Sequence, residues 1–314
     1  LLVLFISFSA VSAEGNFTAF QDEIDSSTDS IDINQDYVYD NGTDYGLDGG
    51  ILINKSDFTI NGNGHTIDGS NQARIFNITG NNITISNLIF TNGNIIGEPG
   101  GALHSSGLII LNNVTFKDNN ADYGGAIYVL GQCIINNALF TNNMASQDGG
   151  AIVAWDDFII NNAMFTDNTA TKSGGAIFTN GNLNLINCLF ENNSANNGGA
   201  VYFNNEITNN LINSTFNGNN ATRAGGAIYV KGPANNNTFI SEFNNNNAKE
   251  ASGGGIFFYK TAENNNIESI FTNNKALYGA GMFFYSESNN NAFEGDFINN
   301  IALSCGGAIF FYTS

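Results

Sequence analysis

Cysteine, proline and positive charge are scarce in this sequence. Its 314 residues include three Cys, two Pro and nine Lys or Arg, against 28 Asp or Glu. Cys133, Cys188 and Cys305 are odd in number and lack CxxC spacing, which argues against a disulfide framework. We expect small buried side chains, with Cys305 the candidate for exposure. The net charge of −19 argues against binding to a polyanion, so nucleic acid is not expected as a partner.

Long apolar runs are absent after the first residues. The opening LLVLFISFSAVSA has small residues at Val11 and Ala13, a pattern typical of a signal-peptide core and its cleavage site. We interpret residues 1–13 as a signal-peptide remnant and expect secretion; a buried N-terminal strand is the alternative. No Met or basic segment precedes Leu1, which indicates that the chain starts inside a longer reading frame. Membrane or wall association is expected only through segments outside this chain, because no other segment is apolar enough for an anchor.

One motif recurs along most of the chain, in a composition rich enough in apolar residues (42%) to build a core. Phe-x-x-Asn-x-Ala occurs eight times, beginning at Phe116, Phe140, Phe165, Phe190, Phe216, Phe243, Phe271 and Phe297. A Gly-Gly-Ala-aliphatic segment or close relative begins eight to ten residues after each Phe, and a further one begins at Gly100. The period is 24 to 28 residues. A unit this short cannot bury its own apolar face, so the copies must stack on one another.

Apolar and polar residues alternate within a repeat, as in ITISNLIF and LNLINCLF, and no repeat segment has helical spacing. This pattern predicts about three short strands per repeat. Leucine-rich repeats need a helical or leucine-patterned return segment, and a β-propeller blade needs roughly 40 residues. The predicted fold class is therefore all-β: a single-stranded parallel β-helix whose turns, or rungs, lie about 4.8 Å apart.

Stacked rungs place equivalent residues in columns. The fourth residue of each glycine segment is predicted to form an inward aliphatic column: Leu103, Ile127, Ile152, Ile177, Val201, Ile228, Ile256, Met282 and Ile309. The Asn of each FxxN is predicted to form a ladder of amide hydrogen bonds between rungs. A second candidate ladder consists of the Asn three residues before each Phe: Asn87, Asn113, Asn137, Asn162, Asn187 and Asn213. From Asn235 an NNN pattern replaces it, which predicts a different turn in the late rungs.

The residues before Gly100 predict a cap and degenerate rungs. Phe17, Phe20 and Ile24 have the spacing of a short amphipathic helix that would cover the open edge of the first rung. We assign residues 14–30 to this cap helix and an acidic lead-in, residues 31–99 to opening rungs, and residues 100–314 to the repeat β-helix. The chain stops inside a predicted strand, so this last region is expected to be incomplete at its C-terminus.

The pairing of GGA[ILV] with FxxN at this period resembles the repeat of the polymorphic outer-membrane proteins of chlamydiae, over Gly100 to Ser314. INGNGHTIDG, residues 60–69, and the run RIFNITGNNITISNLIFTNG after it are similar to the opening rungs of the pectate-lyase-like superfamily. In this combination the chain most resembles the adhesin-like surface proteins of host-associated methanogenic archaea. The resemblance implies a right-handed coil, export to the cell surface or extracellular space, and a role in adhesion or surface architecture.

Many coils of this kind cleave acidic polysaccharides, so an enzymatic function is an alternative for this chain. A glycoside hydrolase needs two carboxylates about 5 to 9.5 Å apart. Asp156 and Asp157 are the Asp pair of the repeats and adjoin Trp155, a candidate sugar platform, but strand alternation would place them on opposite sides. His65 lies in a glycine-rich turn and is expected to be structural, and the scattered basic residues form no lyase site. We predict a non-catalytic protein without a metal site or cofactor.

The residue after each aliphatic column member points outward if that column points inward. These positions are His104, Tyr128, Val153, Phe178, Tyr202, Tyr229, Phe257, Phe283 and Phe310. We call this column the aromatic ladder and predict that its Tyr and Phe side chains bind the ligand of an adhesin, a glycan or protein of a host or microbial surface. Reversed parity, or cover by the loops, would make the ladder structural. Two other functions stay open: a polysaccharide lyase or hydrolase, and a structural coat element.

Overall fold

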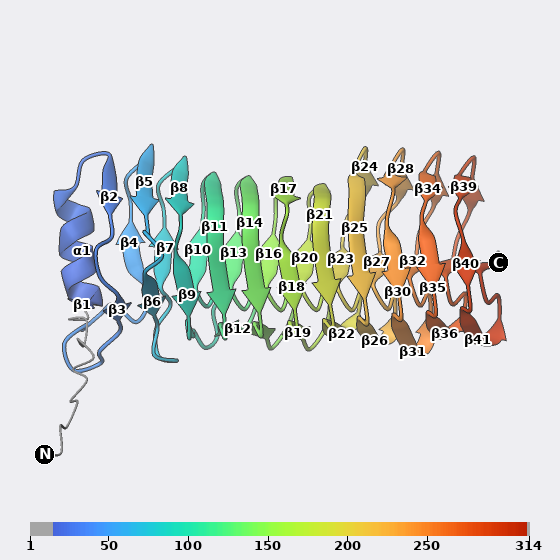
Figure 1. Ribbon diagram of the computed structural model, residues 1–314, viewed down its shortest axis with the longest axis horizontal. Helices are drawn as coiled ribbons and strands as arrows, with labels where there is room; N and C mark the ends of the chain where they lie inside the picture. The colour runs from blue at the N-terminus through green and yellow to red at the C-terminus, as the bar shows by residue number, and fades with distance from the viewer. Residues whose placement is uncertain (1–14, 313–314) are drawn as a thin grey trace, which may run out of the picture.

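The computed structural model describes residues 15–312 as one elongated, right-handed coil of parallel strands with about 11 rungs (Figure 1). Successive rungs pair in register one repeat apart, so Phe116 lies beside Phe140 and Ile127 beside Ile152. The predicted parallel β-helix with about three strands per rung is confirmed. The predicted signal-peptide remnant, residues 1–13, lies outside the described residues.

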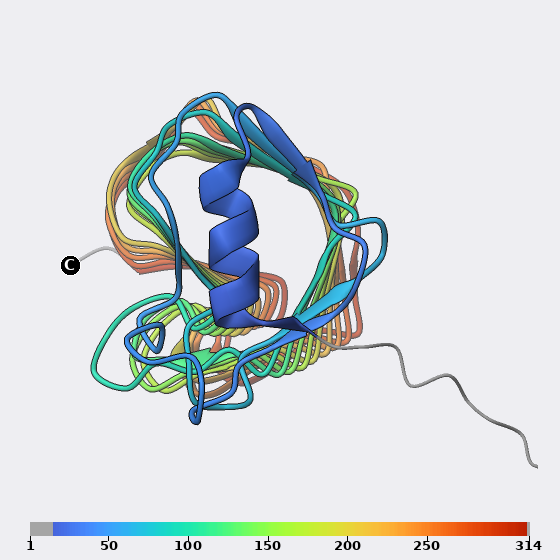
Figure 2. The same ribbon diagram turned by 90° about the vertical axis from the view of Figure 1, so that its left-hand side faces the viewer.

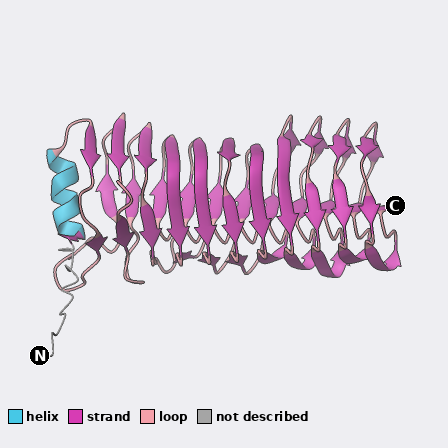
Figure 3. Ribbon diagram, viewed as in Figure 1, coloured by secondary structure: helices cyan, strands magenta, loops and turns pink. Residues whose placement is uncertain are grey.

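Two long sheets form the walls of the coil (Figure 3). The 19-stranded sheet comprises β1 (Gly15–Asn16), β2 (Ser30–Asp32), β3 (Tyr37–Val38), β5 (Phe58–Asn61), β6 (Thr66–Asp68), β8 (Ile83–Ser86), β9 (Ile89–Thr91), β11 (Ile109–Lys117), β14 (Cys133–Thr141), β17 (Phe158–Asn161), β18 (Met164–Thr166), β21 (Leu183–Glu191), β25 (Leu211–Asn217), β29 (Thr238–Phe239), β30 (Glu242–Asn244), β34 (Asn266–Glu268), β35 (Ile270–Thr272), β39 (Ala292–Glu294) and β40 (Phe297–Ile298). The 11-stranded sheet comprises β4 (Ile51–Ile53), β7 (Phe76–Ile78), β10 (Leu103–Ser105), β13 (Ile127–Val129), β16 (Ile152–Ala154), β20 (Ile177–Thr179), β23 (Val201–Phe203), β27 (Ile228–Val230), β32 (Ile256–Phe258), β37 (Met282–Phe284) and β42 (Ile309–Phe311).

Two shorter sheets lie at the corners between these walls. The eight-stranded sheet comprises β12 (Asn120–Ala121), β15 (Met144–Ala145), β19 (Thr169–Ala170), β22 (Ser194–Asn197), β26 (Asn220–Ala224), β31 (Asn247–Ser252), β36 (Lys275–Tyr278) and β41 (Ile301–Cys305). The four-stranded sheet comprises β24 (Ile207–Thr208), β28 (Ala234–Asn235), β33 (Ala262–Glu263) and β38 (Ser288–Asn289). The late rungs therefore turn differently, as predicted, and the change begins one rung before Asn235.

Columns of equivalent side chains fill the interior. The aliphatic column from Leu103 to Met282 has no exposed surface. The rings from Phe90 to Phe297 stack face to face, with neighbouring centroids 4.5 to 5.0 Å apart. Burial of one Phe contributes about 1.5 to 3 kcal/mol, so this column is a major source of stability.

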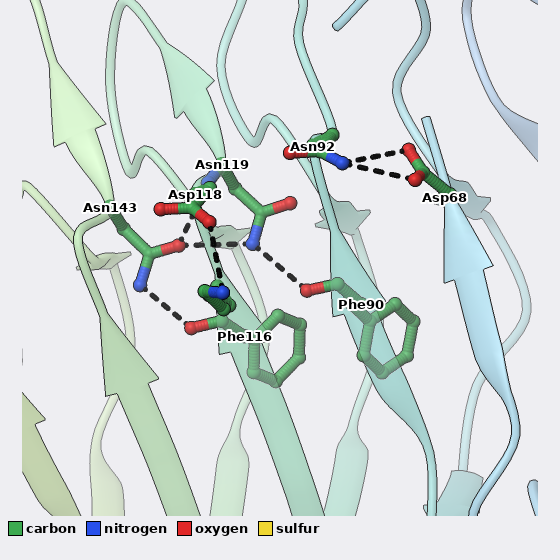
Figure 4. Close-up of polar contacts among 8 residues, drawn as sticks. Asp68, Phe90, Asn92, Phe116, Asp118, Asn119 and Asn143 are labelled. Atoms are coloured by element: carbon green, nitrogen blue, oxygen red, sulfur yellow. Dashed lines mark hydrogen bonds and ion pairs between the residues drawn. The ribbon is translucent and has the colours of Figure 1, made fainter. Parts of the chain in front are cut away.

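The FxxN asparagines form a continuous ladder beside the phenylalanines (Figure 4). Asn119 Nδ2 donates to Asn143 Oδ1 at 3.0 Å and to the Phe90 carbonyl oxygen at 3.2 Å, and the same pattern continues to Asn300. One rung earlier Gly93 takes the ladder position, and its N–H donates to Asn119 Oδ1 at 2.8 Å. The adjacent corner residue Asn92 donates through Nδ2 to both carboxylate oxygens of Asp68, at 3.0 and 3.1 Å. Each ladder amide thus satisfies buried backbone groups that the corner would otherwise leave unpaired.

The second predicted ladder is largely wrong. Asn87, Asn113, Asn137, Asn162 and Asn187 have φ of +53° to +55°, so they serve as left-handed corners. Their side chains reach solvent. Only two side-chain hydrogen bonds join them among the described residues, from Asn113 to Asn87 and from Asn187 to Asn162. A buried second ladder lies instead in the late rungs, where Asn210 donates to Asn237 at 3.1 Å and Asn237 to Asn265 at 2.9 Å.

The helix α1 (Phe17–Ser26) lies across the first rung, where Figure 2 shows it covering the end of the coil. Asn16 caps it, because its Oδ1 accepts the Ala19 N–H at 2.9 Å. Phe17, Phe20 and Ile24 are buried, as the sequence spacing predicts, and the Phe20 ring stacks on Tyr37 with centroids 4.4 Å apart. Among residues 15–312, no helix is long and apolar enough to cross a membrane.

Candidate functional site

The aromatic ladder runs along the outer face of the 11-stranded sheet. On β13, Ile127 and Val129 are fully buried in the interior, and Tyr128 between them is half-buried on the opposite face. Register pairs His104 with Tyr128, Tyr128 with Val153 and Val153 with Phe178, and so on to Phe310. The predicted parity is therefore correct.

The predicted exposure of the ladder is wrong for part of its length. Tyr202, Phe257 and Phe283 are 8%, 6% and 4% exposed, although they point away from the interior. Tyr128, Phe178, Tyr229 and Phe310 are half-buried. Side chains from the eight-stranded sheet cover the late ladder, where Ala224 and Tyr278 pack against Phe257, Phe283 and Phe310. Sequence patterning gives the direction of a side chain on its strand, whereas this cover depends on how the corner folds back.

Most neighbouring rings of the aromatic ladder stack face to face. Phe178 and Tyr202 are 5.3 Å apart and inclined by 8°, and Tyr202 and Tyr229 are 4.9 Å apart and inclined by 18°. A ring stacked on both sides offers a ligand its edge and, for Tyr, its hydroxyl. Carbohydrate stacking on ring faces is therefore confined to places where the stack is interrupted.

A second column of rings, which the sequence analysis missed, lies beside the late ladder. Tyr259, Tyr285 and Tyr312 are 40%, 45% and 45% exposed. Their centroids are 5.2 and 5.3 Å apart. The signal was present in the sequence, because IFFY and MFFY place a third ring two residues after the ladder position and on the same side of the strand.

The two columns form the floor of an open cleft of about 500 Å³. Its wall comes from the eight-stranded sheet and includes Ala251 and Tyr278, with Arg223 as the lining cation. Burial raises the pKa of Tyr229, which lines the cleft. Its hydroxyl therefore stays protonated near neutral pH and can donate a hydrogen bond. The cleft combines apolar edges, phenol donors and one positive charge.

The candidate catalytic carboxylates accept hydrogen bonds from backbone N–H groups of their own rung and the next. Asp156 and Asp157 lie in the exposed bend between β16 and β17. Asp156 Oδ1 accepts the Asp157 N–H at 2.8 Å, and Asp157 Oδ1 accepts the Asn182 N–H at 2.7 Å, which fits a role in shaping the bend. His65 Nδ1 lies 3.0 Å from Asp36 Oδ1 in a neighbouring rung.

The part of the chain that the structure describes has no cluster of metal ligands and no paired cysteines. Residues 15–312 contain no group of three or more His, Cys, Asp or Glu placed to hold a metal ion. Cys133 and Cys188 are buried and Cys305 is exposed, as expected from the sequence. Burial raises the pKa of both buried thiols, which keeps them protonated.

The central rungs of the coil match the model of a known protein repeat. Five stretches match the Chlamydia polymorphic membrane protein repeat, at residues 113–130, 137–154, 162–180, 187–204 and 213–231. These five stretches of the chain are similar to that repeat. Each matched stretch runs from the corner before FxxN to the end of the next strand of the 11-stranded sheet, so it includes one ladder position. The matches cover less of the chain than the expected Gly100 to Ser314, although the later rungs keep the same register. No curated protein and no solved structure matches the chain.

Proposed function

We propose that this chain is a non-catalytic, surface-exposed adhesin-like protein, a passenger or stalk that attaches through the aromatic cleft of its late rungs. The observation that carries the proposal is the cleft itself, in which Tyr259, Tyr285 and Tyr312 expose stacked rings beside Arg223. Contiguous exposed apolar surface on a soluble fold marks contact sites. The other rungs form an elongated column that would hold such a site away from the opposite end of the molecule.

The repeat supports a surface location. It takes its name from membrane proteins of Chlamydia, and the coil that it builds here is a polymorphic-membrane-protein-like β-helix. Secretion, attachment and the partner are proposals for this chain, as is its resemblance to the adhesin-like proteins of methanogenic archaea. A surface glycan or protein fits the cleft, because Tyr, other aromatic residues and Arg are the side chains most enriched at recognition sites.

The proposal is tested by a binding assay on glycan arrays and on cell-surface protein extracts. The double variant Tyr259→Ser/Tyr285→Ser removes two exposed rings, and Tyr45→Ser removes an 83% exposed ring outside the cleft. We expect the double variant to bind at least tenfold more weakly, and Tyr45→Ser to bind like the unchanged protein. Equal binding by all three would contradict attachment through the cleft and would favour a structural coat element.

A parallel reducing-sugar release assay tests the enzyme alternative. Asp156 and Asp157 are the carboxylates to replace, since they adjoin Trp155 on an exposed bend. Under the proposed function no polysaccharide is cleaved. Release that Asp156→Ala or Asp157→Ala abolishes would establish a lyase or hydrolase instead.

A further inference from the structure

The aromatic ladder has one missing ring. Register places Val153 between Tyr128 and Phe178. Each of the remaining ladder positions from His104 to Phe310 carries a ring. Tyr128 stacks on His104 at 5.5 Å, and Phe178 stacks on Tyr202 at 5.3 Å. No ring among the described residues stacks on the other face of Tyr128 or of Phe178 along the ladder. With rungs about 4.8 Å apart, these two positions are separated by roughly twice that distance, and the smaller Val153 side chain, which is 2% exposed, lies between them.

A pocket of about 290 Å³ lies at this interruption. Tyr128 and Phe178 line it together with Trp155, which directly follows β16 and is 51% exposed. Pockets for drug-sized ligands have volumes of about 300 to 1,000 Å³, so this one suits a single ring. It shares no lining residue with the late cleft.

Polar groups lie among the rings of the pocket. Asp148, Asn180 and Asn204 line it. Asn180 Oδ1 accepts a hydrogen bond from Asn204 at 2.8 Å, but the buried Nδ2 of Asn180 has no partner among the described residues. A buried donor without an acceptor costs about 1 to 3 kcal/mol, and such a group at a pocket points to a ligand that accepts from it. Burial raises the pKa of Asp148, and hydrogen bonding by Ser173 offsets part of that rise.

We propose that the pocket at Val153 binds one pyranose ring of a glycan, which takes the place of the missing ring in the ladder. The C–H faces of a sugar would lie against Tyr128 and Phe178, and its hydroxyls would accept from Asn180 Nδ2 and donate to Asp148. An aromatic side chain of a protein partner would fill the same space but would leave Asn180 Nδ2 unpaired. The inference goes beyond the proposed function, since the pocket is independent of the late cleft.

Trp155 is the only tryptophan of the chain, so its fluorescence reports on this pocket directly. The unchanged protein is titrated with the methyl α- and β-glycosides of glucose, galactose, mannose and N-acetylglucosamine. We expect a saturable change in emission with at least one of them. Val153→Phe supplies the missing ring from the protein itself; it is expected to weaken that binding at least tenfold and to leave the melting temperature unchanged or higher.

Two further variants keep the test decisive if Val153→Phe folds poorly. Asn180→Ala removes the unpaired donor and is expected to weaken binding at least tenfold. Tyr259→Ser, in the late cleft, is expected to leave it unchanged, so failure of the cleft and failure of this pocket are distinguishable. The proposal is overturned if no glycoside changes the emission, or if Val153→Phe and Asn180→Ala bind normally. Stronger competition by N-acetyltyrosinamide than by any glycoside would instead make this a site for an aromatic side chain.

Discussion

Asn193 shows how one amide connects three rungs. Its Nδ2 donates to the Phe165 carbonyl oxygen at 2.8 Å and to Asn219 Oδ1 at 3.0 Å. Its Oδ1 accepts from the backbone N–H and the Nδ2 of Asn168, at 3.0 and 2.9 Å. The side chain has no exposed surface, so water cannot replace these partners. The ladder therefore depends on a group with both a donor and an acceptor, which excludes Asp and Leu of similar size.

Asn193→Ala is expected to lower the free energy of unfolding by about 2 kcal/mol or more, because it leaves at least two buried groups without a hydrogen-bond partner, at about 1 to 3 kcal/mol each. The control is Asn196→Ala in the same rung, whose side chain is exposed and makes no hydrogen bond among the described residues. Urea denaturation followed by circular dichroism measures both. A loss below 1 kcal/mol for Asn193→Ala, equal to that of the control, would contradict a stabilising ladder.

Residue positions on strands could be predicted from the sequence, and their burial could be predicted only in part. The inward Ile127 and the FxxN amides follow from strand alternation and from identity between repeats. Burial of Phe257 does not, because Ala224 and Tyr278, which lie on the strand before each glycine turn, decide it. The same limit hid the pocket at Val153: the missing ring is visible in the sequence, but the free Asn180 amide is a fact of three-dimensional contacts.

At the scale of one element, α1 depends on a buried carboxylate from a loop. Asp44 has no exposed surface and accepts the N–H groups of Phe17 at 3.1 Å and Thr18 at 2.8 Å, together with the Thr18 hydroxyl and the Asp40 N–H. Burial alone would raise the pKa of Asp44, but these hydrogen bonds outweigh it and lower the pKa below its usual 3.8. The helix N-terminus also favours a negative charge at this place.

The cap should therefore be stable at mildly acidic pH and loosen only under strong acid. Since the folded-state pKa of Asp44 is lowered, its contribution is fully present above the unfolded value of 3.8 and is lost as the pH falls through the folded value. Amide hydrogen exchange in α1 should show protection that is constant from pH 7 to about pH 5 and falls below about pH 4.

Asp44→Ala should lose that protection at every pH, whereas the exposed control Asp22→Asn should behave like the unchanged protein. Protection in α1 that is the same with and without Asp44 would show that packing of Phe17 and Phe20 alone holds the helix. The helix itself could be predicted from its apolar spacing. Asp44 could not, because it lies well over 20 residues away in a loop with no motif.

At the scale of the whole molecule, rungs contact their immediate neighbours in a uniform way, so a complete rung should be removable. Deletion of residues 162–186 joins Asn161 to Asn187, which occupies the position of Asn162 one repeat on. The phenylalanine and asparagine columns then continue from Phe140 to Phe190. We expect a folded coil that is shorter by one strand spacing, about 4.8 Å, in small-angle X-ray scattering.

Deletion of half a rung, residues 162–173, is the matched control. It shifts the following strands out of register and turns their apolar residues away from the interior, so the β-sheet signal in circular dichroism should be lost or reduced. If the full-rung deletion unfolds the protein as completely as the half-rung deletion, stability is not additive over rungs. The number and register of the rungs could be predicted from the repeat alone, because the same residues recur at every contact.

Stacking in register also determines which ionised side chains lie next to one another in a column. The corner position before each ladder asparagine carries Asp118, Asn142, Asp167 and Asn192 in successive rungs, all with φ near +55°. Two like charges about 4 Å apart repel by about 1 kcal/mol even in water, and here an amide separates the two acids. Deamidation of Asn142 during ageing would convert this spacer to an acid and line up three carboxylates. The shelf life of the coil is thus linked to the chemical fate of a few neutral amides on its edge.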